Sequence, residues 1–117
     1  AQRLVRKICS NCKTEYEPAA SLRKAIEKTG DKEQKYYRGV GCKKCRNTGY
    51  SGRIAIHELF VPDDEILEMI TDGASLKNLR QAAIQKGMVS LEQDGIEKVQ
   101  AGIISIEEVL RTTQIGI

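Results

Sequence analysis

The second half of the chain carries apolar residues at the spacing of a helix. In four segments, leucine, isoleucine or valine recurs every three or four residues, which places these side chains along one helical face. Each segment follows an aspartate or serine that can cap a helix, and the first three end near a glycine. The pattern predicts helices at Asp64–Thr71, Leu76–Lys86, Leu91–Ala101 and Ile106–Thr113.

The predicted caps of these helices are Asp63, Ser75, Ser90 and Ser105. Gln93 and Glu108 follow the last two caps at the spacing of a capping box, in which the two residues satisfy each other's backbone N–H groups. Because the connections are short, we expect a compact bundle of about four helices over residues 62–117. We interpret its apolar stripes as core rather than as a groove for a partner.

The first half of the chain reads as short strands separated by turns. Alternating apolar positions predict strands at Gln2–Ile8, Tyr37–Val40 and Arg53–Phe60. A proline suited to a first helical position and an apolar stripe predict a helix over Pro18–Lys28, and a polar connector, Lys32–Tyr36, follows. Residues 47–52 have turn composition. Together the two halves indicate an α+β fold with a few short antiparallel strands.

Composition places the chain among globular proteins. Its 117 residues fit one domain, and 40% hydrophobic residues are enough to bury a core, which argues against disorder. No apolar run is long enough to span a bilayer, and the first residues lack the apolar segment of a signal peptide. The sequence lacks an initiating methionine and begins in a strand-like segment, so we expect a fragment of a longer protein.

Charge is divided unevenly along the chain. Residues 1–53 contain 14 Lys and Arg against 5 Asp and Glu, a net charge of +9, whereas residues 54–117 contain 5 against 11, a net charge of −6. We interpret this as two solvated faces that pair with each other or with neighbouring subunits. A nucleic-acid surface in the first half is the alternative, although four zinc-bound thiolates would lower its charge to about +7.

The four cysteines give the strongest chemical signal. Cys9, Cys12, Cys42 and Cys45 form two C-x2-C pairs with 29 residues between them, and the chain has no other cysteine. Such a pair lets two sulfurs in a tight turn approach one metal ion at about 2.3 Å, and two pairs complete a tetrahedron. This pattern predicts a structural Zn²⁺ in an element spanning residues 9–52, with a redox pair, an iron–sulfur cluster or a metal-free site as alternatives.

The residues around the cysteines fit a structural rather than a catalytic metal. Nearby Lys7, Lys13, Lys43, Lys44 and Arg46 favour thiolates. Four protein ligands leave no open position for substrate. The only histidine, His57, is interpreted as a strand residue beside Glu58 and not as a ligand.

We find no catalytic or cofactor-binding residue in the chain. The phosphate-loop pattern G-x-x-x-x-G-K-[ST] is missing, and the Gly39–Gly41 segment is too short for a dinucleotide fingerprint. The acidic run Asp63–Glu65 opens a predicted helix, where negative charge complements the helix dipole. The chain alone is therefore expected to hydrolyse no ATP.

Five stretches, in the same order, resemble the ATPases of type II secretion and type IV pilus assembly. The segment Ala1–Arg6 leading into Cys9-x2-Cys12 is similar to the end of their ATPase core. The other four are Gly41-Cys42-x2-Cys45-x3-Gly49-Tyr50-x-Gly52-Arg53, Ile56-x-Glu58-Leu59, Gly87-Met88-x-Ser90-Leu91-x2-Asp94-Gly95 and Gly102-Ile103-x-Ser105-x-Glu107-Glu108-Val109-Leu110-Arg111. Ile104 departs from the threonine often found there.

The resemblance implies a part of a larger motor. Its relatives are hexameric, RecA-like ATPases, cytoplasmic and peripheral at the bacterial inner membrane, that use ATP and Mg²⁺ to drive secretion or pilus assembly through a membrane platform protein. The chain would supply a last core-type strand (1–8), the tetracysteine element with an inserted helix (9–52), a returning strand (53–61) and a helical subdomain (62–117). The ATP-binding and catalytic motifs would lie upstream, membrane contact would come only through partners, and no nucleic acid is expected.

A stand-alone zinc-ribbon-like module that binds nucleic acid or protein is the alternative function. Under either function, zinc should hold residues 9–45 together, because this segment has few large apolar side chains of its own. Residues 63–113 have their own caps and apolar stripes, so we expect them to keep their helices without metal.

Overall fold

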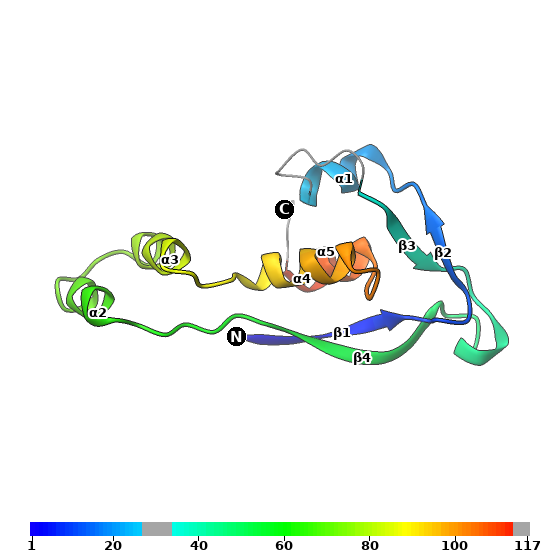
Figure 1. Ribbon diagram of the computed structural model, residues 1–117, viewed down its shortest axis with the longest axis horizontal. Helices are drawn as coiled ribbons and strands as arrows, with labels where there is room; N and C mark the ends of the chain where they lie inside the picture. Colours follow the sequence, from blue (N-terminus) through cyan, green and yellow to red (C-terminus); the bar gives the residue numbers. More distant parts are fainter. Residues whose placement is uncertain (27–33, 114–117) are drawn as a thin grey trace.

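The computed structural model describes residues 1–26 and 34–113. Its strands are β1 (Gln2–Ile8), β2 (Lys13–Tyr16), β3 (Tyr36–Gly39) and β4 (Tyr50–His57). Its helices are α1 (Ala20–Ile26), the 3₁₀ turn η1 (Lys43–Cys45), α2 (Asp64–Thr71), α3 (Leu76–Gln85), α4 (Leu91–Gln100) and α5 (Ile106–Thr113). Strand β1 pairs antiparallel with β4, and β2 with β3, so the expected α+β fold is confirmed (Figure 1).

The β1–β4 hairpin is the floor on which the core is built. A two-stranded hairpin is marginally stable alone, so one face must be covered. Val5 lies opposite Ile54 in the register, and α5 and α4 pack against β1 and β4 on the face that buries Val5 and Ile56. The fully buried core is completed by Tyr36, Val99, Ile104, Ile106 and Val109.

A glycine sets how closely α4 approaches α5. A Cβ atom at Gly95 would overlap the side chain of Val109 and come within 3.7 Å of Ile56. Because Gly95 has no side chain, α4, α5 and the β1–β4 hairpin can pack closely around this position. Any larger residue at position 95 must push these elements apart.

Two helical carboxylates satisfy outward-facing N–H groups on the hairpin edges. The backbone N–H of Arg6 in β1 donates to Oε2 of Glu108 at 2.9 Å, and that of His57 in β4 donates to Oδ2 of Asp94 at 2.7 Å. Unpaired edge N–H groups invite pairing with another strand. Helix α5 thus protects part of β1, and α4 protects part of β4.

The strand β2 is not predicted by the sequence pattern. It is short, three of its four residues are exposed, and it is stable because Lys13–Tyr16 pairs with Tyr36–Gly39 across the inserted segment. The predicted strand Tyr37–Val40 is one residue too late. Tyr36, the last residue of the predicted polar connector, is a buried core residue.

Strand β4 begins and ends three residues earlier than predicted. Its first residue, Tyr50, pairs with Ile8 across a bulge that carries one extra residue of β4. Gly52 lies in this bulge with a φ of +76°, which glycine adopts without strain. Residues 50–52, the second half of the predicted turn at residues 47–52, therefore belong to the strand.

The predicted helices agree with the structure to within one or two residues. Helices α2 and α5 have the predicted bounds, while α3 and α4 end one residue early and α1 begins at Ala20 instead of Pro18. The predicted end of that first helix, Lys28, lies outside the described residues. The side chains of Asp63, Ser75 and Ser90 cap their helices as predicted.

The predicted capping box of Ser105 and Glu108 is wrong. The Ser105 hydroxyl lies 3.2 Å from the Tyr50 hydroxyl, and the Glu108 carboxylate accepts from Arg6 and Arg111. The start of α5 is buried against β1, so these side chains bond to the hairpin instead of to each other.

The four C-terminal helices pack as two pairs and not as one compact bundle. Helix α2 packs on α3, and α4 packs on α5 over the hairpin. The extended Glu58–Pro62 segment leads the chain from β4 out to α2, which lies at the opposite end of the molecule from the turns between β3 and β4 (Figure 1). The extents are 56 × 28 × 21 Å and the radius of gyration is 16.9 Å, against roughly 13–14 Å for a compact domain of this length.

The described helices are all short. None of them, in residues 1–26 and 34–113, combines the length and apolar character needed to cross a bilayer. Several large apolar side chains are nevertheless exposed near α2 and α3, among them Leu59, Val61 and Leu76.

Candidate metal centre

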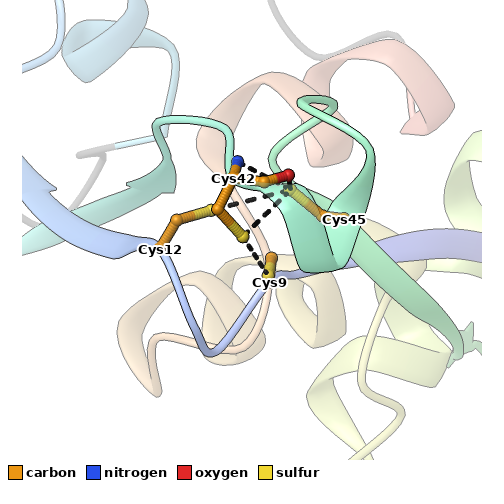
Figure 2. Close-up of side chains that lie close together, drawn as sticks. All are labelled: Cys9, Cys12, Cys42 and Cys45. Atoms are coloured by element: carbon orange, nitrogen blue, oxygen red, sulfur yellow. Dashed lines mark hydrogen bonds between the residues drawn. The ribbon is translucent and has the colours of Figure 1, made fainter.

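The structure brings the four predicted ligands together (Figure 2). Cys9 and Cys12 lie in the turn that follows β1, and Cys42 and Cys45 flank and end the short η1 turn. All four sulfurs lie within 4.8 Å of one another. The β1–β4 pairing continues into this site through the Cys9 N–H, which donates to the Gly49 carbonyl at 2.9 Å.

Three of the six sulfur–sulfur distances match those expected around a tetrahedral metal. Zinc–sulfur bonds of about 2.3 Å in a regular tetrahedron place the sulfurs about 3.8 Å apart. The Sγ atoms of Cys9 and Cys42 are 3.7 Å apart, those of Cys12 and Cys45 are 3.8 Å apart, and those of Cys42 and Cys45 are 3.6 Å apart. All four cysteines are free, so the cluster is a set of thiols and not a pair of disulfides.

Backbone N–H groups point at the sulfurs from the turns. The Gly49 and Cys42 N–H groups each lie 3.2 Å from Sγ of Cys45, and the Gly41 N–H lies 3.4 Å from Sγ of Cys12. The Asn11 side-chain amide lies 3.2 Å from Sγ of Cys42. Such donors stabilise thiolate charge and orient the ligands of a structural zinc site.

Close approach of two glycines makes this arrangement possible. A Cβ atom on Gly39 would overlap the backbone of Gly49, and one on Gly49 would overlap the Gly39 carbonyl. The β3 strand end therefore packs directly against the loop that follows η1. This contact holds the Gly49 N–H beside the sulfurs, and it explains why both position 39 and position 49 require glycine.

The environment separates the thiols by acidity. Burial raises the pKa of the Cys12 thiol to about 12. Burial also opposes ionisation of Cys45, but the N–H bonds from Gly49 and Cys42 outweigh it and lower that pKa to about 6. The Asn11 amide lowers the pKa of Cys42. The surroundings of Cys42 and Cys45 therefore favour the thiolate form. A cation bound among the sulfurs would allow all four cysteines to ionise.

Tight cysteine turns and nearby basic residues predict thiolates that are stabilised in part by backbone N–H groups, but the sequence alone does not identify the donors. The structure identifies them as the N–H groups of Gly41, Cys42 and Gly49 and the side-chain amide of Asn11. A signal for them was present, because glycines flank the second cysteine pair and an asparagine lies inside the first. His57 lies on β4 and is not part of the only group of close metal-ligating side chains found among the described residues. Its neighbour Glu58 accepts hydrogen bonds from Arg80 and from the Leu91 N–H, so it connects β4 to α3 and α4.

A buried ion cluster ties the strand entering the metal centre to the last helix. The Glu108 side chain is 1% exposed, and its carboxylate lies 2.6 Å from the Arg6 guanidinium and 2.9 Å from that of Arg111. Burial opposes its ionisation, but the bonds from both arginines and from the Arg6 N–H outweigh that cost and lower its pKa to about 2. One step further along, the Ile8 N–H donates to the Ile103 carbonyl. The metal centre is therefore anchored to α5 through β1.

Comparison with known proteins gives a consistent result over almost the whole chain. The family model described as type II/IV secretion system protein matches residues 1–111. The chain is 44% identical to a type IV pilus assembly ATPase (PilB) of Thermus thermophilus, 41% to the type II secretion system protein HxcR of Pseudomonas aeruginosa and 40% to the type II secretion system ATPase E of Vibrio cholerae. Each match covers 97% of this chain but only 13%, 21% and 22% of the respective relative, so the chain spans about a fifth or less of their length.

Proposed function

Because the chain belongs to the type II/IV secretion system protein family, we propose that it is the tetracysteine and helical portion of an ATP-driven motor for type II secretion or type IV pilus assembly. The positions of the four sulfurs support a structural role for zinc in this portion. The two cysteine turns are about 30 residues apart in sequence and bring four sulfurs within 4.8 Å of one another, so one Zn²⁺ would crosslink them without a large apolar core.

The metal would make the end of the molecule a rigid docking element. The cysteine turns lie at the far end of the β1–β4 hairpin, and the Arg6–Glu108–Arg111 cluster fixes that hairpin to α5. A displacement of the helical part would then move the metal centre with it instead of being absorbed by loops. This coupling suits transmission of force to assembly partners.

ATP hydrolysis belongs to the larger protein in this proposal. The chain has no phosphate-loop sequence, so ATP and Mg²⁺ would bind in the part that the relatives possess and this chain lacks. We assign the parent protein a homo-hexameric ring in the cytoplasm, peripheral to the inner membrane. There the docking element would contact the membrane platform and the cytoplasmic proteins of the machine.

The tyrosines favour this function over single-stranded nucleic-acid binding. Each of the four tyrosines holds a cation over its ring: Arg6 lies 4.0 Å from the Tyr50 centroid, and the other pairs are Lys13 with Tyr37, Arg23 with Tyr36 and Arg38 with Tyr16. Bases bound without sequence preference need open aromatic faces for stacking. Here a lysine or arginine of the same chain already lies over each tyrosine ring.

The proposal is tested in the full-length protein with Cys42→Ser, and with Lys24→Ser on the exposed face of α1 as a matched control. We expect Cys42→Ser to lose zinc and to lose secretion or pilus assembly, while basal phosphate release by the purified protein persists. The control should keep all three. Normal assembly by a Cys42→Ser protein that contains no zinc would refute the docking role.

A further inference from the structure

Two parts of the chain carry charge of a single sign, and the two signs are opposite. Residues 1–14 and 39–53, which include β1, the cysteine turns and the first half of β4, contain eight Lys and Arg and no Asp or Glu. Residues 54–76, which include the second half of β4, the segment that follows it and α2, contain six Asp and Glu and no Lys or Arg. Even with four thiolates and one Zn²⁺ contributing −2, the first group keeps a net charge of about +6.

The exposed charges of the cysteine turns and those of α2 cannot meet within one chain. The cysteine turns lie at one end of the longest dimension and α2 lies at the other, as Figure 1 shows, and that dimension is 56 Å. Electrostatic attraction between exposed charges is screened beyond roughly 8–10 Å at ordinary salt concentrations. Any direct pairing of the basic end with the acidic end must therefore be between two copies.

The charges at both ends are available for a partner. Lys43, Lys44 and Arg46 are exposed, and no ion pair involves them within the described part of the chain. On α2, the exposed residues Asp64, Glu68 and Asp72 are spaced by four and so form one row. The other acidic residues of this helix start, Asp63 and Glu65, are bound to Lys86 of the same copy.

Exposed apolar side chains accompany the charges. On α2, Leu67 is about half exposed, and Leu59 and Leu76, which precede and follow α2 in the sequence, are 75% and 83% exposed. Near the cysteine turns, Val40 is 61% exposed. Apolar side chains between complementary charges supply the area that charge pairs alone do not, because exposed ion pairs contribute little by themselves.

We propose that the basic cysteine-turn end of one copy docks on the acidic α2 face of a second copy, head to tail. The contact is heterologous, since each copy uses two different surfaces, and it leaves one free surface at each end for a further copy. It adds a specific contact to the oligomer proposed above but does not depend on motor activity. Phosphate release tests the motor, whereas association of this chain tests the contact.

The test is sedimentation of the zinc-loaded 117-residue chain over a range of concentrations at low and high salt. At low salt the average mass should rise with concentration above the monomer mass of 13.0 kDa, and at high salt it should return to that value. A zero-length carbodiimide crosslinker should join Lys43 or Lys44 to Asp64 or Glu68. Mixing ¹⁴N- and ¹⁵N-labelled chains should show that these links join two copies, with Lys86–Glu65 as the intramolecular reference.

Charge reversal makes the test specific. Lys43→Glu with Lys44→Glu should abolish association, and so should Asp64→Lys with Glu68→Lys. A mixture of the two variants should restore it, because each altered end then faces an end of opposite sign. The control, Lys24→Glu with Lys35→Glu, makes the same change in net charge away from both ends and should associate as the unaltered chain does. Zinc content and circular dichroism establish that each variant is folded.

Three results would overturn the proposal: a monomer at every concentration at low salt, association that survives either charge reversal, or a variant mixture that stays monomeric. Binding of anionic vesicles or of a short oligonucleotide that requires Lys43 and Lys44, in a chain that never self-associates, would assign the basic end to that other partner and equally reject a second copy.

Discussion

Glu108 offers a direct way to measure what joins β1 to α5. Its carboxylate is almost fully buried and accepts hydrogen bonds from the Arg6 N–H and from the Arg6 and Arg111 guanidinium groups. Substitution by glutamine keeps the volume and one acceptor but removes the charge. Both arginines would then face a neutral group, so the variant should be less stable.

The size of the effect follows from the pKa. The folded protein lowers the Glu108 pKa from 4.5 to about 2, and each unit is worth about 1.4 kcal/mol, so the ionised form is favoured by roughly 3 kcal/mol. The two arginines are about half exposed, which screens the interaction, and we expect Glu108→Gln to lose about 2–3 kcal/mol at neutral pH. Because the folded pKa lies below the unfolded one, this stability is present above about pH 4.5. It disappears as the pH falls towards 2.

The assay is urea unfolding followed by circular dichroism from pH 7 to pH 3. The stability difference between the natural chain and Glu108→Gln should be largest at pH 7 and should shrink below pH 4.5. Glu107→Gln is the control. The Glu107 carboxylate is next to Glu108 in the sequence but is exposed, and among the described residues it accepts a hydrogen bond only from the Tyr16 hydroxyl, at 2.8 Å. Equal losses for the two variants, or a difference that stays constant with pH, would refute the buried-charge argument.

Three further predictions concern packing, metal and activity. Gly95→Ala should destabilise the chain by about 1–3 kcal/mol in the same assay, because the new Cβ overlaps Val109. Gly73→Ala is the control: its Cβ would lie in open space, so its loss of stability should be smaller and should come only from the positive φ at that position. Removing zinc with a chelator should abolish amide protection in β2, β3 and the cysteine turns while α2–α5 stay protected; an even loss from residue 9 to residue 113 would show a single cooperative unit. The isolated chain should release no phosphate from ATP, and turnover proportional to purified chain would contradict this.

The sequence predicts elements well where local signals decide them. Asp63, Ser75 and Ser90 cap their helices as the pattern indicates, because a cap depends on only three or four neighbouring residues. The cysteine spacing likewise brings four sulfurs together without reference to the rest of the fold. Family membership also follows from local motifs in a fixed order.

The sequence fails where distant residues decide the structure. Strand β2 exists because its residues pair with residues of β3 that lie 20 to 26 positions later in the sequence, and the polar composition of β2 does not predict that pairing. Ser105 and Glu108 have the spacing of a capping box. In the folded chain, however, the Glu108 carboxylate is buried and accepts hydrogen bonds from Arg6, 102 residues away in sequence. The division of the four helices into two pairs depends on the extended Glu58–Pro62 segment, whose path the helix pattern does not encode.

The metal content of the purified chain tests the central claim most directly. Elemental analysis of the natural chain and of Cys42→Ser, both expressed with zinc in the medium, counts the metal that the four cysteines hold. The tetrahedral sulfur spacing predicts one zinc per chain in the natural protein and a large loss in the variant. A natural chain that is folded without zinc, or a Cys42→Ser chain that keeps full zinc occupancy, would contradict the account.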